Sequence, residues 1–148
     1  MQNSQSNTPA AGILRLTLSS AGVVVCLIAC IWVWQMLNGQ QALWPLPALY
    51  LLELNIVSIV CWLAINHRGS RAAPWVTMLP WGAIGIFVAF AVMGAMSIGF
   101  LFLPVALLFV LAVLLSDHQH SPVKITHIGV CALMALAQVI LMLLLIQL

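Results

Sequence analysis

Charged residues are what this sequence lacks most. Only 4% of its 148 residues are Asp, Glu, Lys or Arg, whereas 65% are hydrophobic. Soluble domains carry about 25% charged residues, so a chain this poor in charge cannot cover a surface exposed to water. The sequence therefore predicts an all-α integral membrane protein, whose main surroundings are the hydrocarbon of a lipid bilayer.

The scarcity of charged residues also excludes several functional classes. A net charge of +2 provides no basic surface for a nucleic-acid partner. We find no nucleotide-binding, cofactor-binding or catalytic motif, so we predict no catalytic residues, no cofactor and no enzymatic activity.

The four cysteines lie inside apolar runs and show no zinc-type pairing, which is typical of small buried apolar residues. The segment Leu27-Ile28-Ala29-Cys30 resembles a bacterial lipobox. The apolar run continues past it through Ile31-Trp32-Val33-Trp34, however, which favours a spanning helix over a lipidated Cys30.

The apolar runs predict a bundle of five transmembrane helices, since a spanning helix needs about 20 residues. The chain from Trp75 to Ser116 has no charge and would be about 60 Å long as one helix, twice the ~30 Å hydrocarbon thickness. We therefore divide it at the glycine-rich segment 94–99. Residues 1–12 are predicted to be a polar disordered tail, and residues 13–148 a single transmembrane domain. The predicted spans are about 13–37, 46–66, 75–95, 98–116 and 122–147.

The basic residues favour five spans over the alternative of four. With five spans, Arg15, Arg68, Arg71 and Lys124 all fall on one side of the membrane. With four, Lys124 falls on the opposite side. By the positive-inside rule, five spans place the N-terminus in the cytoplasm and the C-terminus outside. We expect a multi-pass protein of a cell membrane, and we interpret that membrane as a prokaryotic cytoplasmic membrane.

Three polar residues inside the predicted spans, Glu53, Asn55 and Gln138, are the candidate intramembrane polar site. A carboxylate is costly in hydrocarbon, so we expect Glu53 to be protonated, or paired and facing the bundle interior. Gln138 lies at about the same depth in the fifth span, where Glu53 or Asn55 could bond it. Glu53 is then either a titratable residue of a transport site or, in the favoured interpretation, part of a structural hydrogen bond between helices.

The second span also carries a polar stripe. Asn55, Ser58, Trp62 and Asn66 recur at three- and four-residue spacing, which places them along one face of a helix. The stripe could line a polar cavity, but we interpret it as a contact between helices.

A second candidate site gathers at the predicted cytoplasmic ends of the fourth and fifth spans. Imidazole and carboxylate groups can bind zinc or another transition metal. A His-x-His spacing alone is a weak signal, however, since histidines in loops are usually solvated. The candidate metal ligands are Asp117, His118, His120 and His127.

Small residues mark the faces on which helices can approach closely and gain van der Waals contact within a membrane. We predict that the third and fifth helices are the central packing elements or docking surfaces for a partner. The helix-packing candidates are Gly82, Gly85 and Ala89 on the third span, and Gly129, Ala132 and Ala135 on the fifth.

The predicted function follows from short loops, the absence of a soluble domain and these small-residue faces. We expect a non-enzymatic structural or accessory subunit of a membrane complex, whose partners are other membrane subunits or further copies of itself. The alternative is a small transporter or channel that uses Glu53 as a titratable residue.

The odd number of spans yields the first testable prediction. A C-terminal fusion to a reporter that is active only in the cytoplasm should be inactive, because five spans place that terminus outside. The same reporter at the N-terminus, as the control, should be active. An active C-terminal fusion would mean an even number of spans and an error in the division at residues 94–99.

Overall fold

The computed structural model describes residues 9–37, 46–67, 74–93, 99–120 and 125–147. Within these ranges the chain is helical and contains no strand. Five helices are long and apolar enough to cross a membrane, which agrees with the predicted five rather than four. The elements are α1 (Pro9–Leu37), α2 (Leu46–Asn66), α3 (Pro74–Met93), the 3-10 helix η1 (Gly99–Phe102), α4 (Leu103–His120) and α5 (Ile125–Gln147).

The observed helices differ from the predicted spans mainly at their ends. Helix α1 begins at Pro9, so residues 9–12, predicted as part of a disordered tail, are helical. Proline is well tolerated at such a start because its missing N–H has no partner in the first turn. The fourth span starts with η1 before α4, and Pro104 lies in the first turn of α4 instead of kinking its interior. Most of the predicted turn at residues 94–99 lies outside the described residues.

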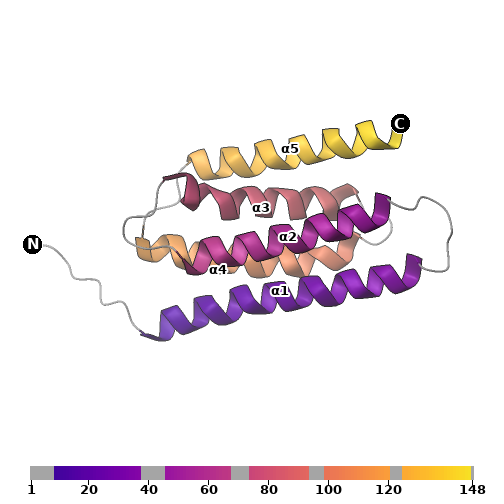
Figure 1. Ribbon diagram of the computed structural model, residues 1–148. Helices are drawn as coiled ribbons and strands as arrows, with labels where there is room; N and C mark the ends of the chain where they lie inside the picture. Colours follow the sequence, from indigo (N-terminus) through magenta and orange to yellow (C-terminus); the bar gives the residue numbers. More distant parts are fainter. Residues whose placement is uncertain (1–8, 38–45, 68–73, 94–98, 121–124, 148) are drawn as a thin grey trace, which may run out of the picture.

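Helices α1 to α4 form a ring in which each helix packs against the next. Helix α1 contacts α2 and α4, and α3 contacts α2 and α4 on the other side. Successive helices run in opposite directions, as Figure 1 shows. We call the end where α1, α3 and α5 begin the N-terminal end of the bundle, and the other end the C-terminal end.

The core of the ring is apolar and well filled. Phe87 of α3 and Phe109 of α4 stack with ring centroids 5.7 Å apart. Leu54, Ile65 and Val105 are fully buried in the same core. A Cβ atom at Gly22 of α1 would lie 3.1 Å from the Phe109 ring, so this glycine lets α1 approach α4 closely.

Helix α5 is a peripheral addition to this ring, and its backbone approaches only that of α3. Figure 1 shows it along the outer edge of the bundle beside α3. Of the two roles predicted for α3 and α5, central packing element or docking surface, α5 does not have the first within this chain. Helix α3 is the central element, because it contacts α2, α4 and α5.

The small residues of α3 explain how closely α5 approaches. A Cβ atom at Gly85 would collide with the carbonyl oxygen of Cys131 and lie 3.1 Å from the Ala135 backbone nitrogen. Gly82 and Ala89, one helical turn to either side, are also buried. Four of the predicted packing residues, Gly82, Gly85, Ala89 and Ala135, thus lie on buried or half-buried faces.

Gly129 and Ala132, also predicted as helix-packing residues, make no such contact with the described residues of this chain. Both residues are exposed, and a Cβ atom at Gly129 would meet nothing within 4 Å. At about 100° per residue, both positions turn away from α3 when Cys131 and Gln138 face inward. Sequence spacing alone does not distinguish these two faces, because small residues occur on both.

The contact at Gly85 gives a prediction about stability. The variant Gly85→Ala places a methyl group against the backbone of α5, which cannot yield without moving the helix. We expect it to lower the free energy of unfolding by about 1–3 kcal/mol, measured as a lower thermal midpoint in detergent. The control Gly129→Ala should change the stability by less than about 0.5 kcal/mol. Equal midpoints for the two variants would refute the close approach.

Candidate functional site

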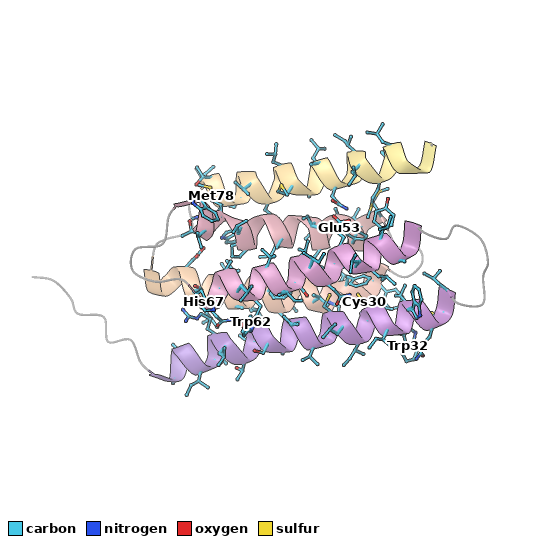
Figure 2. All side chains as sticks on the ribbon, in the orientation of Figure 1. Cys30, Trp32, Glu53, Trp62, His67 and Met78 are labelled. Atoms are coloured by element: carbon cyan, nitrogen blue, oxygen red, sulfur yellow. The ribbon has the colours of Figure 1, made fainter. Side chains whose placement is uncertain are left out.

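The first polar contact of the candidate site joins α2 to α5. Gln138 Nε2 donates a hydrogen bond to Glu53 Oε2 over 3.2 Å. Gln138 is only 6% exposed, and Glu53 is half-buried. Figure 2 shows Glu53 in the half of the bundle nearer its C-terminal end. Since the backbones of α2 and α5 do not approach each other, this bond reaches across the edge of α3.

Asn55 does not take part in this contact, although the sequence left it as an alternative partner for Gln138. Its Nδ2 donates to the carbonyl oxygen of Leu51 in the same helix over 2.8 Å. Its Oδ1 is buried and has no partner among the described residues. The structure therefore brings together two of the three predicted intramembrane polar residues and directs the third toward its own helix.

A second polar cluster joins α3, α4 and α5 in the other half of the bundle. Trp81 Nε1 of α3 donates to Asp117 Oδ2 of α4 over 2.9 Å. The Trp81 ring stacks on His127 of α5, with centroids 6.0 Å apart and an interplanar angle of 21°. Asp117 is 0% and His127 3% exposed. Buried polar groups require such partners, because an unsatisfied group costs about 1–3 kcal/mol.

The cluster includes two of the four predicted metal ligands. Asp117 and His127 both contact Trp81, whereas the side chains of His118 and His120 lie outside the described residues. Among the side chains that the structure describes, no group of three or more His, Cys, Asp or Glu could hold a metal ion. A protein zinc site has three or four ligands, so metal binding stays a prediction that depends on His118 and His120. The visible role of the pair is to join three helices around Trp81.

Sequence reasoning missed the part that Trp81 plays. Tryptophan at this depth is typical of the membrane interface, so nothing in the local sequence singles it out. The position of each residue along its helix is the signal from which this contact could have been predicted. Trp81 lies in the second turn of α3, and Asp117 in the last turns of α4. Antiparallel neighbours bring these two positions to the same level, as they do for Glu53 and Gln138.

The polar stripe of α2 lies at its interface with α1. Trp62 Nε1 donates to Ser20 Oγ, and Asn66 Nδ2 donates to Ser19 Oγ, both over 3.0 Å. Ser58 is fully buried and donates to the Asn55 carbonyl oxygen over 2.8 Å. The interpretation of the stripe as a helix contact is therefore confirmed at Trp62 and Asn66. Trp62 is labelled in Figure 2.

The cysteines contribute to the same interface without forming disulfides. Cys26 and Cys30 of α1 donate thiol hydrogen bonds to the carbonyl oxygens of Leu54 and Leu51, over 3.7 and 3.8 Å. None of the four is in a disulfide, and Cys26, Cys30 and Cys61 are buried. This fits the prediction that they act as small apolar residues.

The polar clusters are separated by apolar helix surface. Between Trp81 and Ala89, helix α3 carries only apolar side chains. Between His127 and Gln138, helix α5 carries only apolar residues and Cys131. In the part of the chain that the structure describes, these polar groups bond their neighbours and do not line a path from one end of the bundle to the other. The arrangement can join helices, and it offers little to a polar substrate.

Comparisons of the chain with protein families, with curated proteins and with solved structures find no match.

The bond between α2 and α5 gives a quantitative prediction. In a double-mutant cycle of Glu53→Leu and Gln138→Leu, the two changes should be non-additive. We expect a coupling energy of about 0.6 kcal/mol, and at most about 1.7, as for hydrogen bonds between membrane helices. The free energies of unfolding would be measured in detergent for the four proteins. The cycle Asn55→Leu with Gln138→Leu is the matched control and should be additive. Additive effects at Glu53 and Gln138 would contradict the bond.

Proposed function

We propose that the chain is a multi-pass protein of a cell membrane and a non-enzymatic structural or accessory subunit of a membrane complex. The observation that carries this proposal is the division of the bundle. A ring of four helices has a filled apolar core. The backbone of a fifth helix packs, among the described helices, against α3 alone, and most of its residues are not buried.

The filled core supports a structural role over transport. A transport pathway through a bundle is lined by polar groups that can replace the hydration shell of the substrate. The described interior is instead occupied by large apolar side chains such as Phe87, Phe109 and Leu54. The buried polar residues Asp117 and Gln138 are engaged in bonds between helices.

The free face of α5 supports a role in assembly. It exposes large apolar side chains such as Leu133 and Leu136. Gly129 and Ala132 lie among them and are exposed as well. Small residues allow another helix to approach closely enough for van der Waals contact to hold it. This face is where we expect a partner subunit, or a second copy of the chain, to bind.

The distribution of charge supports one orientation. Arg15 lies in the first turns of α1, and the other three basic residues lie in segments that follow α2 or precede α5. Helix α1 begins, α2 ends and α5 begins at the N-terminal end of the bundle. By the positive-inside rule this end faces the cytoplasm, and we assign the protein to a prokaryotic cytoplasmic membrane.

The test is extraction of the tagged protein into nanodiscs, followed by mass spectrometry of the chains that co-purify. We expect a partner chain in stoichiometric amount. The variant Ala132→Leu should reduce its recovery about tenfold, since an overpacked helix contact costs about 1–3 kcal/mol. Ala21→Leu, at an exposed alanine of α1, is the matched control and should retain the partner.

Two results would overturn the subunit role. One is a wild-type protein that purifies without partner chains and without further copies of itself. The other is an equal loss of the partner in both variants. The half-buried Glu53 keeps the transporter alternative open to test in proteoliposomes. A proton flux that Glu53→Gln abolishes would favour transport, whereas a subunit should give no flux above empty vesicles.

A further inference from the structure

Two cysteines of α1 lie one helical turn apart and face α2. The spacing of Cys26 and Cys30 places both side chains on the same face of the helix. Their thiols donate to the carbonyl oxygens of Leu54 and Leu51 of α2, over 3.7 and 3.8 Å. Cys26 is 0% and Cys30 5% exposed. The interface between the two helices therefore contains a pair of buried sulfur atoms.

The two sulfur atoms are close enough to hold the same ligand. The thiols of Cys26 and Cys30 lie within hydrogen-bonding reach of each other. Sulfur ligands select soft metal ions. Because a thiol is only a weak hydrogen-bond donor, little is lost when the protons on these sulfur atoms are replaced by a metal ion.

Each sulfur atom also has a polar side chain of α2 beside it. Ser58 lies within hydrogen-bonding reach of Cys26, and Asn55 within reach of Cys30. One N–H of the Asn55 amide donates to the Leu51 carbonyl oxygen over 2.8 Å, which leaves its second N–H for the sulfur of Cys30. The Ser58 hydroxyl can rotate toward Cys26. Hydrogen bonds of this kind favour the charged form of the group that accepts them.

The oxygen of the same amide points to a positively charged ligand. Asn55 Oδ1 is buried and has no hydrogen-bond partner among the described residues. An oxygen in this state is costly, and an ion that occupies the site in the functional protein is one of the recognised reasons for it. A cation held by Cys30 would lie beside this oxygen, since the amide is already within reach of that sulfur.

The pair can be reached from the outside of the bundle. Cys30 and Asn55 line a groove of about 270 Å³ between α1 and α2, together with apolar and aromatic side chains such as Ile31 and Trp34. Figure 2 shows Cys30 in the half of the bundle nearer its C-terminal end. An ion can enter at Cys30 and then reach Cys26, which is more deeply buried.

The small number of ligands selects the metal. Protein zinc sites have three or four ligands, and iron–sulfur clusters are held by four. Among the side chains that the structure describes, no further His, Cys, Asp or Glu joins the two cysteines to complete such a set. Copper(I) is a soft ion, and two thiolates alone can hold it.

We propose that Cys26 and Cys30 bind one copper(I) ion between α1 and α2. Both thiols release their protons to the solvent, and no electron is transferred. The ion and the two thiolates together carry one negative charge, which the amide N–H of Asn55 and the hydroxyl of Ser58 stabilise. The proposal does not depend on the role as an accessory subunit.

The experiment is anaerobic titration of the purified full-length protein with copper(I), kept reduced by ascorbate, in competition with the chelator bicinchoninate. The wild type should bind one copper ion per chain, and X-ray absorption should find two sulfur ligands. The variants Cys26→Ser and Cys30→Ser should each lose this binding. Cys61→Ser, at a buried cysteine of α2, is the matched control and should retain it. Ser58→Ala should weaken the binding about tenfold, as the loss of a group that supports a metal ligand does.

A further variant keeps the test decisive if Cys26→Ser or Cys30→Ser does not fold, as judged by circular dichroism. The double variant Cys61→Ser with Cys131→Ser removes the other two cysteines of the chain, and it should still bind one copper ion. Loss of copper from this double variant would overturn the site, as would full binding by Cys26→Ser or Cys30→Ser. Stoichiometric binding of zinc(II) at the same two cysteines, with no copper(I) bound, would overturn the choice of metal.

Discussion

The arrangement of this protein depends on how closely the backbone of α5 approaches α3 at Gly85. A side chain at this position would collide with the carbonyl oxygen of Cys131. The approach brings His127 onto the Trp81 ring at one level and Gln138 within reach of Glu53 at another. Since the backbone of α5 contacts no other helix that the structure describes, these contacts determine its position. A shift of α5 by the width of one methyl group would strain both contacts.

Helix α3 consequently takes part in two different kinds of packing. Toward α4 it presents a large aromatic side chain, Phe87, and the core of the ring is filled as in any compact helical bundle. Toward α5 it presents Gly82, Gly85 and Ala89, and the contact depends on small residues and close backbones. The first kind closes the ring. The second kind leaves most of α5 exposed, which is the basis of the proposed role in assembly.

Much of the arrangement could be predicted from composition and spacing. Runs of about 20 apolar residues identified the five helices, and the length of the uncharged region required its division in two. Counting depth along antiparallel helices brought Glu53 and Gln138 to the same level, and the structure contains that hydrogen bond. The bond between Trp81 and Asp117 follows the same geometry. The sequence did not predict it because Asp117 was expected at the cytoplasmic end of a span, as a candidate metal ligand, whereas its side chain is fully buried.

The sequence by itself determined the helical fold class, the number of apolar helices and the depth of each polar residue, because these depend on residue type and on the fixed rise of a helix. Only the tertiary structure decided which face of each helix is covered. Ala132 and Ala135 are equally small, yet Ala132 is exposed and Ala135 is half-buried beside Gly85. The physical reason is that an apolar environment exerts little preference between apolar faces. The choice comes from shape, through the fit of Gly85 against Cys131, and from the few polar groups that must find partners.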